Sequence, residues 1–289
     1  GDSGDERVHD AGLEMAEILE RGIASATTPG KMWPLAGVEL LPPVPRPGKL
    51  LAVAANYQDH IRESGLPPVD KSKRVPRLFL KPTTSLLAPG AALKLPAVSH
   101  TVDWELELAV VIGRSASFVT VGSALRHVAG YAIINDVSAR SLDWDVARDD
   151  DPWNGFFDWL NGKWLDGFAP MGPWLRTADE VPDPQDLWLT LRVNGAERQH
   201  ARTSDMIFSV AELVAFASRL MTLHPGDVIA TGTPAGVGAA TQTYLNAGDL
   251  VEGTIDGLGT LVTPVVRGDD HPGGVLSTMY NSGDAGNRG

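Results

Sequence analysis

Short runs of apolar residues, separated by Gly, Pro and Asp, dominate the chain from about residue 49 onward. Apolar runs of this length between turn residues are typical of buried strands. The pattern predicts strands at Leu50–Ala54, Leu78–Leu80, Leu106–Ile112, Tyr131–Ile134, Leu187–Val193, Val228–Thr231 and Leu261–Val266.

Helical periodicity is rarer in this part of the chain. Ser209–Leu220 combines an apolar stripe with Ser209 as N-cap and Glu212 three residues later, which is a capping box. Val121–His127 is a second, shorter candidate helix. Because strands dominate and helices are few, the pattern predicts a mixed, β-rich α+β fold and not a doubly wound sheet.

A proline-rich stretch divides the chain into two unequal parts. Leu41–Pro47 (LPPVPRP) favours neither a helix nor a strand ladder, so we expect a small N-terminal lobe and linker at residues 1–47, with a helix at about residues 9–23. The catalytic body would cover residues 48–267. Residues 268–289 have the composition of a disordered tail, and the tryptophan-rich residues 144–164 that of a functional loop with little periodicity.

Composition narrows the classes of partner. The 289 residues carry a formal net charge of −12, which disfavours nucleic acid and anionic membranes. No apolar run approaches the roughly 20 residues that span a bilayer, and the polar start lacks the apolar region of a signal peptide. The chain has no cysteine, so disulfides and thiolate metal sites are excluded. We expect a cytoplasmic protein with a small-molecule substrate.

Three acidic residues stand at the ends of predicted strands. Glu105 and Glu107 are two apart on one strand, so their side chains share a face, and Asp136 follows the apolar run Tyr131–Ile134. Two carboxylates on one face repel each other unless a cation lies between them. A solvated strand edge is the alternative that the local pattern leaves open. An oxygen-only site built from all three would suit Mg²⁺, with Mn²⁺ or Ca²⁺ as substitutes.

Six motifs follow one another along the chain: NYQDH (56–60), FLKP (79–82), ELELAVVIG (105–113), GYAIINDVSAR (130–140), GK (162–163) with FAPMGPW after it, and ATGTPAGVG (230–238). Together they resemble the fumarylacetoacetate hydrolase family over about residues 41–266. The resemblance implies a β-rich roll, a homodimer, and Mg²⁺ or Mn²⁺ bound by Glu105, Glu107 and Asp136.

Candidate acid–base groups lie in two of these motifs or beside them. His60 and Glu63 are one helical turn apart, so Glu63 can orient the imidazole and stabilise its charge. The residues alone also allow a surface polar pair, whereas the resemblance implies a pair that activates water. A lone lysine usually faces solvent, but the resemblance implies that Lys163 contacts a substrate oxyanion or leaving group. Lys81 is similar to another family lysine and is a candidate substrate contact.

The glycine-rich stretch Thr231–Gly238 follows a predicted strand but lacks the Gly-Lys-Ser/Thr of a P-loop. Its backbone amides, with that of Gly232 as a candidate, and the hydroxyl of Thr233 could receive a substrate carboxylate. A plain flexible turn is the alternative.

Two positions depart from the family pattern. Asp143 stands where the carbon–carbon hydrolases of the family usually carry a glutamine, and an ionised aspartate cannot donate the glutamine's hydrogen bond. Asp143 is therefore a protonated donor, a partner for Arg140, or the sign of another substrate. Ala55 stands where several members carry arginine. Arg140 and Asp143 are kept as candidate substrate-binding residues.

The three carboxylates and the resemblance predict a metal-dependent hydrolase that cleaves a carbon–carbon bond in an acylpyruvate-like 2-oxo acid, with water activated by His60 and Glu63. The alternative is decarboxylation, tautomerisation or hydration of a related acid, because each reaction needs the same metal chelate. A third hypothesis is a metal-stabilised binding protein without activity. The set of His60, Glu63 and Lys163 argues against it.

Overall fold

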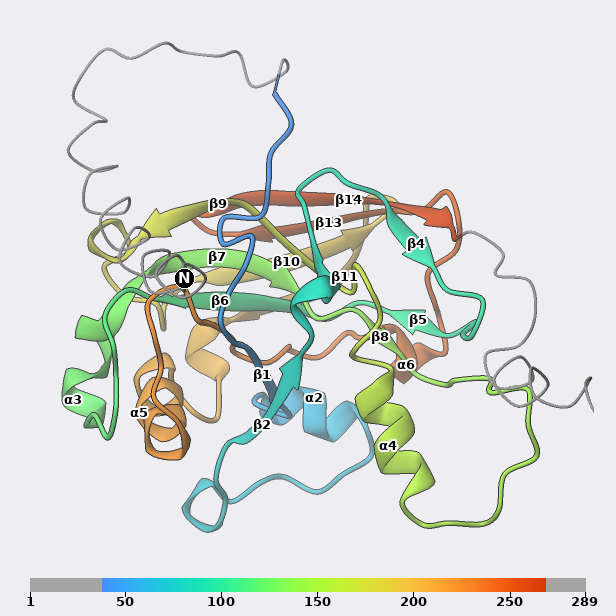
Figure 1. The fold of residues 1–289 in the computed structure, drawn as a ribbon, viewed down its shortest axis with the longest axis horizontal. Coiled ribbons are helices and arrows are strands. Elements are labelled where there is room, and N and C mark those ends of the chain that lie inside the picture. The colour runs from blue at the N-terminus through green and yellow to red at the C-terminus, as the bar shows by residue number, and fades with distance from the viewer. Residues whose placement is uncertain (1–37, 269–289) are drawn as a thin grey trace, which may run out of the picture.

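In the computed structural model, which describes residues 38–268, a seven-stranded sheet runs through the middle of the fold (Figure 1). Its strand order is β2-β1-β12-β6-β7-β9-β3. The strands are β1 (Leu50–Ala54), β2 (Arg77–Lys81), β3 (Leu86–Leu87), β6 (Leu106–Ile112), β7 (Val128–Asn135), β9 (Ala169–Thr177) and β12 (Val228–Ala230). Neighbouring strands are antiparallel except for the parallel pairs β1–β12 and β3–β9.

A second sheet has the order β11-β10-β13-β14-β4 and packs on the first. Its apolar side chains join those of β6 and β7 in one buried cluster, so the main core lies between the two sheets. Its strands are β4 (Leu93–Leu95), β10 (Trp188–Val193), β11 (Ala196–Arg202), β13 (Leu250–Ile255) and β14 (Gly259–Arg267), and a separate short ladder joins β5 (Val102–Asp103) to β8 (Ser138–Ala139).

The helices are short and lie around the sheets. They are α2 (Gln58–Glu63), α3 (Val121–Ala124), α4 (Asn154–Asn161), α5 (Val210–Leu220) and α6 (Gly238–Thr241), with 3₁₀ turns η2 (Lys71–Lys73), η3 (Thr83–Ser85), η4 (Leu125–His127), η5 (Ala178–Glu180) and η6 (Thr203–Asp205). Figure 1 shows α3 beside α5 at one end of the molecule, and α2 and α4 on the side of β1 and β2. Within residues 38–268 no helix is long and apolar enough to cross a membrane.

The two faces of the seven-stranded sheet differ, and this difference positions the acidic residues. On β6, Leu106 and Leu108 point into the core between the sheets, whereas Ala109 belongs to a smaller buried cluster on the other face. Side chains alternate along a strand, so Glu105 and Glu107 share the face of Ala109. The carboxylates therefore stand where this smaller apolar cluster ends.

The β-rich α+β class is confirmed, and each strand expected from the apolar runs is present with ends shifted by at most a few residues. The capping box of α5 is also confirmed, because Ser209 and Glu212 each accept a hydrogen bond from the other's backbone amide. The segment Val121–His127 forms α3 followed by η4. Residues 144–164 are not a loop throughout as expected, since they contain α4.

The described residues include only part of the two chain ends for which the sequence made predictions. The helix expected at residues 9–23 and nearly all of the tail at 268–289 lie outside the described residues. Val44, inside the expected linker, is buried and packs with Leu50 and Val228. The division at residue 47 stays a prediction.

Candidate functional site

Glu105, Glu107 and Asp136 meet at the end of the β6–β7 pair. The register pairs Glu107 with Ile134, so Glu105 lies opposite Asp136, whose amide donates to the Glu105 carbonyl at 2.8 Å. One carboxylate oxygen from each acidic residue lies within 4.8 Å of the others. All three residues are at most 5% exposed. The solvated strand edge, left open by the sequence, is therefore excluded for these side chains.

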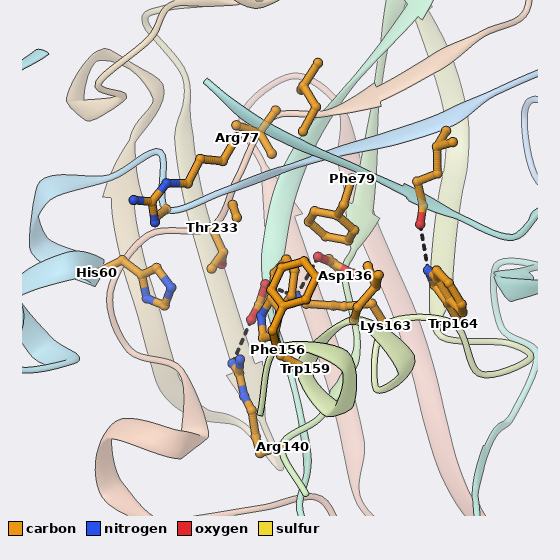
Figure 2. Close-up of a pocket in the computed structure, with 17 residues that line it drawn as sticks. His60, Arg77, Phe79, Asp136, Arg140, Phe156, Trp159, Lys163, Trp164 and Thr233 are labelled. Atoms are coloured by element: carbon orange, nitrogen blue, oxygen red, sulfur yellow. Dashed lines mark hydrogen bonds and ion pairs between the residues drawn. The ribbon is translucent and has the colours of Figure 1, made fainter. Parts of the chain in front are cut away.

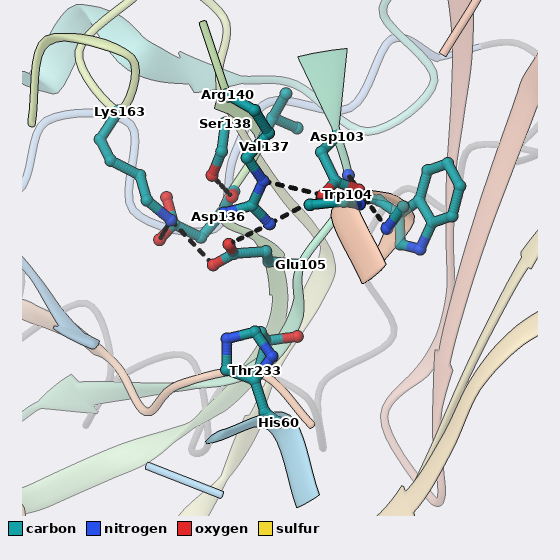
Figure 3. Close-up of polar contacts among 12 residues, drawn as sticks. His60, Asp103, Trp104, Glu105, Asp136, Val137, Ser138, Arg140, Lys163 and Thr233 are labelled. Atoms are coloured by element: carbon teal, nitrogen blue, oxygen red, sulfur yellow. Dashed lines mark hydrogen bonds and ion pairs between the residues drawn. The ribbon is translucent and has the colours of Figure 1, made fainter. Parts of the chain in front are cut away.

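Three cations surround two of the carboxylates, and Figure 3 shows two of them, Lys163 and Arg140. The ammonium of Lys163 donates to Oε2 of Glu105 at 2.8 Å and to Oδ2 of Asp136 at 2.7 Å. Lys81 donates to Oδ1 of Asp136 at 2.6 Å. An Nη2 atom of Arg140 lies 2.7 Å from Oε1 of Glu105. Burial would raise the pKa of Glu105, but Lys163 and Arg140 lower it to about 2.

Glu107 is the carboxylate that these cations leave without an ion pair among the described residues. Its Oε2 accepts the backbone amide of Gly232 at 2.6 Å. Burial, together with the charges of Asp136 and Glu105, raises the pKa of Glu107 well above its usual range. The site therefore disfavours the negative charge of Glu107 unless a further cation is present.

A divalent cation fits this donor set. Two oxygens bound to one Mg²⁺ lie about 3–4 Å apart, so small side-chain shifts suffice to bring the three carboxylates around one ion. Both oxygens of Asp136 already accept from lysines, but a carboxylate oxygen has lone pairs for more than one partner. A cation there would also neutralise Glu107.

His60 and Glu63 lie on α2, and His60 lines a pocket together with Glu105 and Asp136. Nδ1 of His60 lies 2.7 Å from Oε1 of Glu63, and the other Glu63 oxygen accepts the amide of Gly236 at 2.8 Å. Glu63 is thus anchored at both oxygens and fixes the imidazole ring. Since Nδ1 is engaged, Nε2 is the atom available to exchange a proton with a bound molecule.

Asn56 holds the start of α2 against the glycine-rich loop. Its Nδ2 donates to the carbonyls of Thr231 and Phe208 at 2.8 and 3.0 Å, and its Oδ1 accepts the amide of Phe208 at 2.8 Å. The backbone at Gly232 has φ of 94°, and a Cβ there would lie 2.7 Å from Cβ of Asn56. This close packing sets the position of His60 relative to the carboxylates.

The pocket has a volume of about 800 Å³ (Figure 2). Its polar lining is formed by His60, Arg77, Glu105, Asp136, Arg140, Lys163 and Thr233. In the view, His60 and Lys163 lie on opposite sides. The apolar lining comes largely from β2 and α4, where the rings of Phe79 and Trp159 lie 5.0 Å apart, edge to face.

Of three further candidate substrate contacts, Thr233 lines the pocket, whereas the Gly232 amide is bound elsewhere and Asp143 lies outside the pocket. Thr233 lines the pocket, and its hydroxyl donates to the carbonyl of Leu106 at 3.0 Å. The amide of Gly232, expected to receive a substrate carboxylate, donates to Glu107 instead. Asp143 is exposed, does not line this pocket, and accepts the amide of residue 145 at 3.0 Å.

Asp103 is a fully buried residue that the sequence reasoning passed over. It accepts Nε of Arg140 at 2.8 Å and the two amides at 238–239 at 2.6 and 2.9 Å. Asp103 therefore fixes Arg140 beside Glu105 and connects the end of the glycine-rich loop to the site. Its signal was present in the sequence, since Asp103, Glu105 and Glu107 occupy alternate positions of one stretch.

Comparison with known proteins identifies the family. Residues 49–266 match the family model described as fumarylacetoacetate (FAA) hydrolase C-terminal. The chain belongs to the fumarylacetoacetate hydrolase family. Over 261 residues it is 41% identical to a Bos taurus protein named oxaloacetate tautomerase FAHD2A, mitochondrial, covering 87% of this chain and 79% of that protein.

Solved structures of family members share the fold. A 5-carboxymethyl-2-hydroxymuconate delta-isomerase from Mycobacterium smegmatis is 41% identical with a TM-score of 0.69, covering 83% of this chain and 87% of that one. Maleylpyruvate hydrolase from Sphingobium sp. SYK-6, in complex with manganese(II) and pyruvate, is 35% identical with a TM-score of 0.71, covering 89% and 87%. These relatives are named as a tautomerase, an isomerase and a hydrolase. The homodimer and the cytoplasmic location stay predictions for this family member.

Proposed function

We propose that this family member is a divalent-metal-dependent hydrolase that cleaves a carbon–carbon bond in an acylpyruvate-like 2-oxo acid. The observation that carries the proposal is the position of His60, held by Glu63, in one pocket with Glu105 and Asp136, two of the three clustered carboxylates. The Sphingobium hydrolase structure, with manganese(II) and pyruvate bound, supports both the metal and the 2-oxo acid class.

Glu105, Glu107 and Asp136 would hold the metal, with Mg²⁺ as the proposed ion and Mn²⁺ or Ca²⁺ as substitutes. When bound, the ion supplies positive charge that stabilises the enolate oxygen of a 2-oxo acid. Lys163 lines the pocket and uses two of its three ammonium protons on Glu105 and Asp136. Its third proton is proposed to face the developing oxyanion.

His60 is the proposed general base. It takes a proton from water, and the water oxygen adds to the acyl carbonyl carbon. The bond between this carbon and the methylene carbon then breaks, and the electron pair stays on the enolate of pyruvate. His60 returns the proton to the enolate carbon, so one water is consumed and one carboxylic acid and one pyruvate are formed. Glu63 stabilises the protonated imidazole throughout.

Lys81, Arg140 and Asp143 have weaker cases as substrate contacts. Lys81 is fully buried on Asp136 and does not line the pocket, so we assign it to positioning that carboxylate. Arg140 lines the pocket while bound to Asp103 and Glu105 and keeps its proposed substrate role. The exposed position of Asp143 adds no support for contact with substrate.

Keto–enol tautomerisation of a 2-oxo acid is the second candidate. It is favoured by the name of the 41% identical bovine relative, an oxaloacetate tautomerase. It also needs no donor in place of the missing glutamine, because His60 alone can move a proton between carbon and solvent.

Product analysis distinguishes the two reactions. Purified protein with Mg²⁺ would be incubated separately with acetylpyruvate and with oxaloacetate and followed by NMR and enol absorbance. Formation of acetate and pyruvate in equal amounts supports hydrolysis, whereas faster loss of oxaloacetate enol without bond cleavage supports tautomerisation. Either activity should be lost in His60→Ala and kept in His224→Gln, an exposed histidine at the opposite end of β12. Absence of both activities would reject both candidates.

A further inference from the structure

The end of the molecule where α3 lies beside α5 carries exposed apolar side chains (Figure 1). The backbone holds the two elements together, because the amide of Phe118 donates to the carbonyl of Ser218 at 2.9 Å and Ala116 pairs with Leu223. Four large apolar side chains at this end are between 41% and 76% exposed: Phe118, Val121, Leu125 and Leu220. They do not line the pocket at the carboxylates, so the proposed reaction leaves this surface without a role.

The same end is positively charged, in contrast to the chain as a whole. Arg114, Arg126 and Arg219 are exposed there, and none of the three guanidinium groups has an ion pair or hydrogen bond with a residue that the structure describes. Residues 113–128 and 213–226, which build this end, contain no Asp or Glu, although the chain has a net charge of −12. We call the four apolar residues and the three arginines the α3–α5 patch. Its charge favours a negatively charged partner.

A segment of complementary character occurs in the same chain. Residues 9–23, for which the sequence predicts a helix, lie outside the described residues. At helical spacing Met15, Ile18 and Leu19 share one side, whereas Glu14 and Glu17 share another. The segment holds four acidic residues and one arginine. It therefore offers an apolar side and an acidic side to match the apolar and basic parts of the patch.

The start of the described chain lies close to the patch. Val44 is 2% exposed and lies against Gly226, where a Cβ would be 4.0 Å from Cγ1 of Val44. Gly226 follows Leu220 by six residues, so their Cα atoms are at most about 22 Å apart. Residues 24–43, between the segment and Val44, can span up to about 70 Å. The segment is thus tethered near the patch, with enough chain to reach it.

We propose that residues 9–23 dock on the α3–α5 patch of their own chain, with their apolar side on the four apolar residues and their glutamates facing the three arginines. Docking removes exposed apolar surface from water and neutralises an unpaired positive charge. The tether favours this occupant over a separate partner, because it gives the segment an effective concentration of about millimolar at the patch. A second copy of the chain is the competing occupant.

A distance measurement on the full chain tests the docking, and the absence of cysteine allows site-specific spin labels. The reporting pair is Arg21→Cys with Thr222→Cys, an exposed position two residues after Leu220. The control pair is Arg21→Cys with Thr241→Cys on α6, which Figure 1 shows on the opposite side of the molecule from α3. Pulsed dipolar electron paramagnetic resonance would be recorded with an excess of unlabelled protein, so that only distances within one chain are measured.

The reporting pair should give a short, narrow distance distribution, and the control pair a longer one. Charge reversal by Arg126→Glu with Arg219→Glu should lower the ratio of docked to undocked chains about tenfold, because exposed ion pairs are replaced by repulsion. Adding Glu14→Arg and Glu17→Arg to that variant should restore the short distance.

Three results would overturn the docking. The first is a broad, long distribution for the reporting pair in the otherwise unchanged chain. The second is a short distance that survives reversal of the two arginines. The third is a short distance that disappears when the labelled chains are diluted with unlabelled protein, because the segment would then dock on a second copy of the chain.

Discussion

The ammonium of Lys163 lies 2.8 Å from Oε2 of Glu105, so a residue expected to contact substrate also neutralises an expected metal ligand. The same ammonium lies 2.7 Å from Oδ2 of Asp136. All three groups are buried. The stability of the metal-free protein and its affinity for a divalent cation are therefore linked through Lys163.

Lys163→Met should destabilise the metal-free protein by about 3–5 kcal/mol, because it removes one of the two cations that each of the buried carboxylates Glu105 and Asp136 contacts. Saturating Mg²⁺ should restore much of this loss, since the ion would replace the missing positive charge. Thermal unfolding with and without Mg²⁺ measures both effects. The control is Lys73→Met, whose exposed pair with Asp70 should contribute at most about 1 kcal/mol. A variant as stable as this control would argue against the linkage.

Glu107→Gln, unlike Lys163→Met, should not destabilise the metal-free protein. Gln can keep the hydrogen bond from Gly232, and it removes a buried charge that no described cation pairs with. The metal-free variant should therefore unfold at or above the wild-type temperature, while its affinity for Mg²⁺ falls by about 100-fold or more for the loss of a charged ligand. Calorimetry and thermal unfolding on the same samples give both values. Marked destabilisation without metal would mean that Glu107 has a structural partner.

The triad was predictable because strand geometry needs few assumptions. Glu105 and Glu107 share a face at a spacing of two, and Asp136 ends an adjacent apolar run. The roles of Lys81 and Lys163 as partners of these carboxylates were not predictable, because the contacts join residues 27 to 58 positions apart. Sequence spacing carries no information on such contacts before the strand order is known.

Several elements of the fold have no local sequence pattern that would predict them. Strand β9 contains Pro170 and Pro173, and proline is unusual in a central strand. Strand β11 is mostly exposed, so it has polar residues instead of an apolar run. Helix α4 has no buried residue, and its Phe156 and Trp159 line the pocket instead of forming a core stripe.

Glu63→Gln should lower kcat by about tenfold or more while leaving KM nearly unchanged. Gln can still accept the hydrogen bond of the imidazole, but it does not stabilise the imidazolium that forms when His60 takes a proton. Steady-state kinetics with acetylpyruvate or oxaloacetate, whichever is turned over, would measure kcat and KM separately. The conservative variant Glu63→Asp should recover less activity than wild type, because the shorter side chain cannot reach both His60 and Gly236. A large rise in KM with unchanged kcat would contradict a role in proton transfer.

Ser209→Ala should destabilise the protein by about 1 kcal/mol, because it removes the N-cap of α5.

Glu212, the partner of Ser209 in this capping box, should make the stability of the protein depend on pH. Partial burial acts to raise the pKa of Glu212, but hydrogen bonds from Lys71 and Ser209 lower it overall.

A carboxyl group with a lowered folded-state pKa stabilises the fold above its ordinary pKa, and this contribution is lost as pH falls through the folded value. The stability difference between wild type and Glu212→Gln should therefore be largest at neutral pH and shrink as pH falls below the ordinary value of 4.5. Urea unfolding over this pH range would measure it. A difference that grows on acidification would contradict the assignment.

Crystals grown with Mn²⁺ would test the central claim most directly through an anomalous difference map. The account predicts one peak per chain within bonding distance of Glu105, Glu107 and Asp136, and no such peak in Glu107→Gln. A map without a peak there, with Lys163 and Lys81 still paired to the carboxylates at saturating Mn²⁺, would contradict it.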